Sequence, residues 1–279
     1  MTDEKNAANP LLLTQKDAVA IVSINKPPMN PMSLELFNEL EVLVPKLSTD
    51  RTVRAIVITA EGEDNFSVGM NLKQLAQAGN DSTRMQNILD QRLRVLSAIE
   101  NIRKPVVATL FGYCLGGGLE LPLSCHFRLA AEKDAKIGLP ELDLGTVPAW
   151  GGSARLTRCV GRMHALDMIL RAKMISGQEA YRIGLVNEVV PNEGLKERAL
   201  ELAKELSEMP AIAVSEMLRC IIEYGDQPLQ EGLYQERQAV LNTLGTKDNQ
   251  EGIMAFLQKR KPKFNKQAET NLVRRKDNR

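Results

Sequence analysis

The sequence predicts an α/β fold that is followed by a region of helices alone. Short apolar runs rich in β-branched residues are typical of buried strands; they occur at 18–25, 54–60, 106–111 and 127–131. Segments with helical spacing of apolar residues alternate with these runs, which favours a sheet covered by helices. After about residue 192 the strand-like runs stop, and the remaining periodicity is helical.

In the first half, helix ends can be placed from their capping residues. Ser33 is a good N-cap for a helix that runs to about Leu47, and Pro45 within it predicts a kink or an early end. A short helix is expected at 72–78. A long helix is expected at 83–103, because apolar residues recur there at helical spacing before a Lys-Pro pair.

The second half contains mostly helical segments. Ser176 and Glu179 form a capping box for one of them. A short strand is expected at 185–190. The predicted helices cover 153–160, 165–172, 178–183, 193–208, 211–224, 229–243 and 247–260. Arg155 and Arg158 are interpreted as residues on the solvent face of the first of these helices.

The composition argues against several classes of partner. The 279 residues include 36 basic and 35 acidic ones, so the net charge of +1 gives no reason to expect a nucleic acid or a membrane. The first ten residues are acidic and polar, unlike a targeting peptide, and a cytoplasmic location is expected. The four cysteines show no disulfide framework or zinc spacing, and no metal is expected.

The chemistry is expected in the stretch 111–152. Three adjacent glycines, Gly116 to Gly118, precede an apolar helical run, where unpaired backbone N–H groups suit a developing negative charge on oxygen. Two carboxylates, Glu120 and Glu141, favour acid–base work. Close packing of helix on strand and a solvated first-turn Glu are the alternative interpretations. The sequence contains only two histidines and no nucleophile or phosphate-loop motif.

Four segments in order resemble the crotonase family of enoyl-CoA hydratases and isomerases. They are NFSVGMNLKQL at 65–75, GYCLGGGLEL at 112–121, GLPELDLGTVPAWGGSARL at 138–156 and EGIMAFLQKRKPKF at 251–264. The resemblance extends from about residue 18 to residue 264. It implies a crotonase-type spiral of ββα units at 11–191, a C-terminal helical trimerisation region at 192–264 whose trimers pair as hexamers, and a disordered tail at 265–279.

The resemblance also implies the reaction and the residues that perform it. The expected reaction is hydration of a 2-enoyl-CoA thioester, with the N–H groups of Met70 and Gly117 holding the thioester oxygen. Glu120 would take a proton from water, and Glu141 would protonate the α-carbon. Coenzyme A is part of the substrate, and no separate cofactor is expected. The substrate and CoA contacts implied by the family are Lys26, Pro28, Ser67, Gly69, Asn71, Leu72, Lys73, Gly116, Phe256 and Lys259, the last two contributed to a neighbouring subunit. For Lys26, a solvated turn lysine is the alternative.

Three departures from the family pattern leave the exact activity open. The interval from Glu120 to Glu141 is one residue longer than the commonest spacing, which puts the position of Glu141 in question. Met70 and Asn71 stand where Ala and Asp are usual, so a cyclic or branched acyl group is a hypothesis. His126 replaces a usual Asp, and is either a structural residue at a strand start, the favoured interpretation, or a group that titrates near neutrality.

Other reactions and one other class of function therefore compete with hydration. Within the family, the alternatives are an enoyl-CoA isomerase, a cyclic dienoyl-CoA hydratase and a thioester hydrolase. A single carboxylate suffices for isomerisation, and the presence of two favours hydration. A non-catalytic binding protein, including one that binds RNA, is opposed by the carboxylate pair and by the absence of an aromatic and basic cluster.

Overall fold

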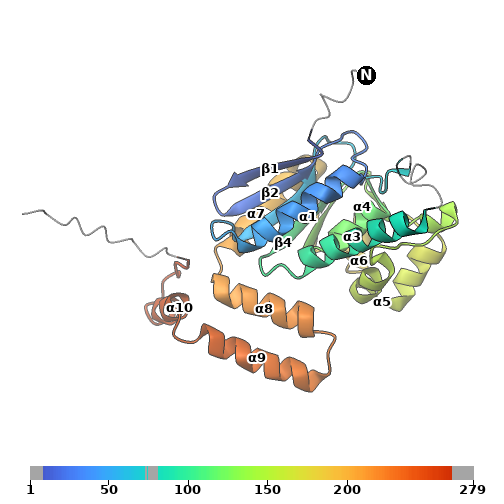
Figure 1. Cartoon of the computed structure of the whole chain (residues 1–279). Helices are drawn as coiled ribbons and strands as arrows, with labels where there is room; N and C mark the ends of the chain where they lie inside the picture. Colours follow the sequence, from blue (N-terminus) through green and yellow to red (C-terminus); the bar gives the residue numbers. More distant parts are fainter. Residues whose placement is uncertain (1–8, 73, 75–80, 266–279) are drawn as a thin grey trace, which may run out of the picture.

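A computed structural model describes residues 9–72, 74 and 81–265 (Figure 1). A six-stranded sheet forms its centre, in the order β1 (Leu11–Lys16), β2 (Val19–Ile24), β3 (Ala55–Ala60), β4 (Val106–Leu110), β6 (Phe127–Ala131) and β8 (Glu188–Val190). β1 is antiparallel to β2, and all the other neighbours are parallel. A second, two-stranded parallel sheet pairs β5 (Tyr113–Leu115) with β7 (Lys136–Gly138).

Some helices pack against the sheet, and others come after the last strand in the chain. Their bounds are α1 (Leu34–Thr49), α3 (Ser82–Glu100), α4 (Gly117–Leu123), α5 (Gly152–Leu170), α6 (Gly177–Arg182), α7 (Leu195–Ser207), α8 (Ala211–Tyr224), α9 (Leu229–Thr243) and α10 (Lys247–Leu257). Two 3₁₀ turns occupy Glu141–Leu144 and Asn192–Gly194. α5 is broken at Gly161, which has a φ of 77°, so it corresponds to the two predicted helices.

The parallel strands bring three loops to one edge of the sheet. Every residue of β3 and β4 is buried, as expected for central parallel strands with both faces covered. Because β2, β3 and β4 run in the same direction, the segments that follow them lie at the same end. Backbone hydrogen bonds link these segments: Val68 N–H donates to Met29 O at 3.1 Å, and Phe66 N–H donates to Phe111 O at 2.9 Å.

The two helix starts predicted from capping residues are confirmed, but the early end predicted at Pro45 is wrong. Ser33 accepts the N–H of Leu36 at 3.2 Å, and Ser176 likewise caps α6. Pro45 does not end α1, which continues to Thr49. A proline inside a helix costs about 3 kcal/mol, and burial of Val44 and Leu47 on either side of it offsets that cost.

Strands β1, β5 and β7 were not expected from the sequence, and β1 is the longest of them. β1 lies at the sheet edge, with only Leu11 buried among its six residues. It therefore lacks the apolar run or clean alternation that identifies a strand. Its pairing with β2 over the whole length of both strands defines it instead.

The C-terminal helices divide into two parts. α7 buries Leu195, Ala199 and Ala203 and packs against β2, β3, β4 and β6, behind the strands in Figure 1, whereas α1 and α3 lie in front. α8, α9 and α10 lie away from the sheet, and α8 packs on α9. The expected disordered tail, apart from its first residue, lies outside the described residues. In the part of the chain that the structure describes, no helix is both long and apolar enough to cross a bilayer.

Candidate active site

The triple glycine forms the turn that starts α4. β5 leads into Gly116, which has a φ of 55°, a conformation that disfavours a side chain. A Cβ on Gly117 would overlap the indole of Trp150, and one on Gly118 would lie 2.5 Å from Ser67 O. The glycines therefore permit close packing, as the alternative interpretation held, and the same absence of side chains leaves the first N–H groups of α4 accessible.

A second backbone segment lies against this turn. A Cβ on Gly69 would lie 2.5 Å from Leu115 O and 3.6 Å from Gly117 N, so the two backbones pass in close contact. Gly69 O accepts the N–H of Met32 at 2.8 Å, and this pairing fixes the loop that presents Met70. Within the described residues, neither the Met70 N–H nor the Gly117 N–H donates to a protein acceptor. Both residues line the same cavity.

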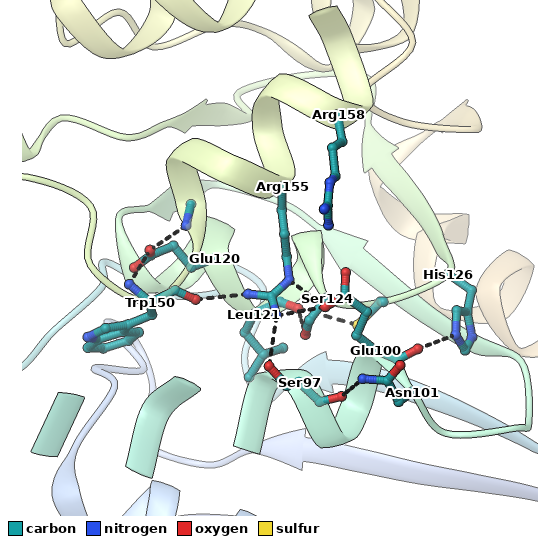
Figure 2. A network of polar contacts seen from close by, with 12 residues as sticks. Ser97, Glu100, Asn101, Glu120, Leu121, Ser124, His126, Trp150, Arg155 and Arg158 are labelled. Atoms are coloured by element: carbon teal, nitrogen blue, oxygen red, sulfur yellow. Dashed lines mark hydrogen bonds and ion pairs between the residues drawn. The ribbon is translucent and has the colours of Figure 1, made fainter. Parts of the chain in front are cut away.

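Glu120 is buried one turn into α4 and is held by two backbone amides. Its Oε1 accepts the N–H of Trp150 at 2.8 Å and that of Gly152 at 2.9 Å (Figure 2). Burial raises the pKa of Glu120 to about 7, against the effect of these two hydrogen bonds. A carboxyl group with a pKa near neutrality can both accept and release a proton at physiological pH.

Glu141 lines the same cavity and comes from the segment that follows β7. It begins a 3₁₀ turn after Pro140, and its Oε1 would lie 2.7 Å from a Cβ on Gly116. Its Oε2 is buried without a hydrogen-bond partner among the described residues. Burial raises the pKa of Glu141, and the proximity of Glu141 contributes to the raised pKa of Glu120. The extra residue between the two carboxylates therefore leaves both in one site.

The cavity is about 500 Å³ in volume and has apolar walls. Polar side chains at its surface come from Glu120, Glu141 and Thr146. The apolar wall residues are Val68, Met70, Leu72, Met85, Leu89, Leu115, Pro140, Leu144, Val147, Ala149 and Trp150. This volume suits a small organic ligand, and apolar walls with a few polar groups are typical of ligand sites.

The other predicted contact residues fall into three groups. Gly69, Leu72 and Gly116 line the cavity, whereas Ser67 is buried behind it and accepts the Gly69 N–H at 3.1 Å. Asn71 lies beside the cavity-lining loop, half-buried, and accepts the N–H of Gln74 at 3.3 Å. Lys73 lies outside the described residues.

The turn that carries Lys26 and Pro28 lies next to the cavity loop. Asn65 Nδ2 donates to Pro28 O at 2.9 Å, and the Lys26 N–H donates to Asn30 Oδ1 at 2.9 Å. Phe256 and Lys259 instead lie on or just after α10, away from the cavity of their own chain. The Phe256 side chain is 84% exposed.

Two expectations about residues behind the site are resolved by packing. The prediction that Arg155 faces solvent is wrong: its side chain is 9% exposed and pairs with Glu100 at 2.7 Å, while Arg158 is 63% exposed as expected. His126 is structural. Its Nδ1 accepts the Val106 N–H at 3.0 Å, so Nε2 carries the proton and donates to Glu100 O at 3.1 Å. Burial lowers its pKa, which keeps the ring neutral at pH 7.

Sequence reasoning missed the residues that complete the site. The amides of Trp150 and Gly152 hold Glu120, and Met85 and Leu89 of α3 form one wall. The Gly-Gly pair at 151–152 was the available signal for the amides. The α3 residues have the same helical spacing as core residues, so nothing in the sequence distinguished them.

Comparisons with known proteins point to one family. The profile described as enoyl-CoA hydratase/isomerase matches residues 14–267. A Bacillus subtilis protein named a probable enoyl-CoA hydratase is 36% identical over 92% of this chain and 98% of its own. The 2,3-dehydroadipyl-CoA hydratase of Escherichia coli is 34% identical over 91% and 98%. The crystal structure of a Bacillus anthracis enoyl-CoA hydratase superposes with a TM-score of 0.86 at 34% identity, covering 91% of this chain and 98% of that one. The α/β crotonase fold predicted from the sequence is confirmed.

Proposed function

Because this chain belongs to the enoyl-CoA hydratase/isomerase family, we propose that it hydrates a 2-enoyl-CoA thioester to a 3-hydroxyacyl-CoA. The observation that carries the proposal is the presence of two carboxylates, the buried Glu120 and the half-buried Glu141, in one apolar cavity beside two accessible backbone amides. One carboxylate is enough to move a proton between carbons. Addition of water needs a proton removed from the water and another delivered to carbon, which suits two.

In the proposed mechanism, the amides of Met70 and Gly117 hold the thioester oxygen. Conjugation makes the β-carbon electrophilic, and attack by water places negative charge on that oxygen. Removal of one oxyanion donor, there a side-chain amide, costs about 2.7–4 kcal/mol in a well-studied acyl-transfer enzyme. Their lack of a described protein acceptor supports this role, because donors already paired would be unavailable.

The two carboxylates divide the proton transfers. Glu120, ionised, takes a proton as the water oxygen bonds to the β-carbon, and Glu141, protonated, delivers its proton to the α-carbon. The two amides on Glu120 Oε1 stabilise its ionised form, while Oε2 of Glu141 has no described partner and is buried, which favours a proton on that group. Coenzyme A belongs to the substrate, and no separate cofactor takes part.

We also propose that the CoA is held by two separate parts of the chain. The turn with Lys26 and Pro28 supports one contact, since it is bonded to the cavity loop. Phe256 and Lys259 would reach the CoA of a neighbouring subunit in a trimer, supported by the exposed position of Phe256 and its distance from its own cavity. The helical region 192–264 would form that assembly.

The test is loss of absorbance of a conjugated enoyl thioester when the protein is added. The wild type is expected to consume substrate and to form a product heavier by one water, identified by mass. E120A and E141A are each expected to lower the rate by about 10²- to 10⁴-fold. Retention of hydration by E141A would refute the role of Glu141, and a panel of thioesters giving isomer or free acid instead of hydrate would refute hydration.

A further inference from the structure

Behind the proposed site, a partly buried ion pair between Arg155 and Glu100 holds the turn whose N–H groups donate to Glu120. This turn, residues 150–152, connects the cavity to α5 and contains a Gly-Gly pair. Gly151 has a φ of 96°, so the turn depends on a conformation that glycine reaches easily and also leaves easily. The turn therefore needs an external restraint if both amides are to stay aimed at one carboxylate oxygen.

Arg155 supplies this restraint through contacts with the backbone of the turn. Its Nη1 donates to Trp150 O at 2.9 Å, on the residue whose N–H donates to Glu120 (Figure 2). The same guanidinium occupies the space beneath Gly151, where a Cβ would overlap Nη1. The Arg155 N–H also donates to Gly151 O at 2.9 Å.

The guanidinium is itself fixed by α3. Its Nε and Nη2 donate to Glu100 Oε2 at 3.0 and 2.7 Å, and Nη2 also lies 3.3 Å from Ser97 Oγ. The Glu100 backbone carbonyl accepts from His126, which ties this part of α3 to the start of β6. With the Arg155 side chain 9% exposed and that of Glu100 25% exposed, the pair is shielded from screening by solvent.

We propose that Arg155, clamped by Glu100, is a positioning residue that fixes the 150–152 turn and thereby the orientation and the charge state of Glu120. This role rests on the proposed function only in its kinetic consequence. The geometry is a chain of contacts from α3, through the guanidinium, to the carbonyl and N–H of Trp150 and then to the carboxylate. Within this chain of contacts, Glu120 is the charged residue that lines the cavity, whereas Arg155 and Glu100 lie behind it.

The charges around Glu120 give the proposal a direction. Among the residues that the structure describes, two charged groups act on Glu120: Glu141 across the cavity, which raises its pKa, and Arg155 from α5, which lowers it. Glu100 faces Arg155 from α3 and offsets part of the arginine charge. Removal of the guanidinium should therefore favour the protonated form of Glu120, and removal of the Glu100 charge should favour the ionised form.

The kinetic experiment uses R155M, R155K and E100Q, with R158M as the matched control. Arg158 lies on the same helix, is 63% exposed and pairs with Asp226 at the surface. The rate of hydration of an enoyl-CoA thioester is measured as a function of pH, with kcat and KM separated. R155M is expected to lower kcat by about 10- to 100-fold, because a small misplacement of a reacting group has that cost, and to change KM by less than about threefold.

The pH dependence of the hydration rate distinguishes a positioning role of Arg155 from a purely structural one. R155M is expected to move the acid limb of kcat/KM to higher pH by at least about half a unit, and E100Q to move it to lower pH. R155K is expected to keep the wild-type limb with a reduced kcat, since it retains the charge but not the forked contacts. Should R155M not fold, E100Q and R155K decide. Variants that melt earlier but keep the wild-type kcat and pH profile would overturn the proposal.

A second readout does not depend on the reaction. The free energy of unfolding is measured from pH 5 to pH 8 for the wild type and E120Q, each with and without R155M. The stability difference between Glu and Gln at position 120 changes from the unfolded pKa up to the folded pKa, so the pH above which it stops changing reports the pKa of Glu120 in the folded protein. That upper limit is expected to rise in the R155M background. An unchanged upper limit refutes the positioning role, whereas a shifted one in a protein without hydratase activity refutes only the proposed function.

Discussion

Replacing Glu120 by Gln is expected to stabilise the protein at pH 8 while abolishing its activity. Glu120 is 2% exposed, and burial raises the pKa of its carboxyl group from 4.5 to about 7. Below pH 4.5 the group is protonated in both the folded and the unfolded chain. Between pH 4.5 and about 7 the unfolded chain releases the proton and the folded chain retains it, so the folded state loses stability as the pH rises through this window.

The size of the effect follows from the pKa difference. One pKa unit corresponds to about 1.4 kcal/mol, so the loss in the wild type approaches about 3 kcal/mol by pH 8. Gln is neutral at every pH, and its amide oxygen can still accept the N–H groups of Trp150 and Gly152. E120Q is therefore expected to be more stable than the wild type by up to about 3 kcal/mol at pH 8, equivalent to about 6 °C in melting temperature, and by less than about 1 kcal/mol at pH 5.

Denaturant unfolding followed by tryptophan fluorescence can measure this difference. Trp150 is the only tryptophan, and it is 3% exposed and packed edge-on against Phe37 at 5.2 Å. E39Q, at an exposed position of α1, serves as the control and is expected to change stability by less than about 0.5 kcal/mol. A stability gain in E120Q that is the same at pH 5 and pH 8, or a loss at pH 8, would refute the reasoning about the buried charge.

Three further predictions follow from the same geometry. G117A is expected to lower activity by about 10²- to 10³-fold, because the added methyl overlaps the Trp150 ring and displaces a proposed oxyanion donor; unchanged activity with a wild-type melting temperature would exclude that amide. W150A keeps the backbone N–H to Glu120 but removes a wall of the cavity, so it should lower stability by about 3–5 kcal/mol and shift preference toward bulkier acyl groups; competition between thioesters measures the shift. F256A combined with K259A is expected to raise KM for CoA thioesters with little change in folding, checked by circular dichroism, and an unchanged KM would remove α10 from the CoA site.

Much of the fold was predictable because its signals are local. Buried strands such as β3 are continuous apolar segments, and the caps of α1 and α6 are single residues followed by a helical period. β1 was not predictable in the same way, because an edge strand with one buried residue is identified by its partner rather than by its own pattern. The continuation of α1 through Pro45 was likewise decided by the core on either side of it.

For the candidate site too, the sequence determines some features and the tertiary structure decides others. The sequence by itself determined the chemical groups: two carboxylates near a glycine turn, a second backbone loop around Met70, and a family resemblance extending over most of the chain. The tertiary structure decided which partners hold them. Glu120 accepts N–H groups from residues 30 and 32 positions later, and the Arg155 side chain pairs with Glu100 of α3. Periodicity along a chain reports the side of an element that is buried, but hydrogen bonds and charges act across space, so the state of Glu120 is set by contacts that no local pattern contains.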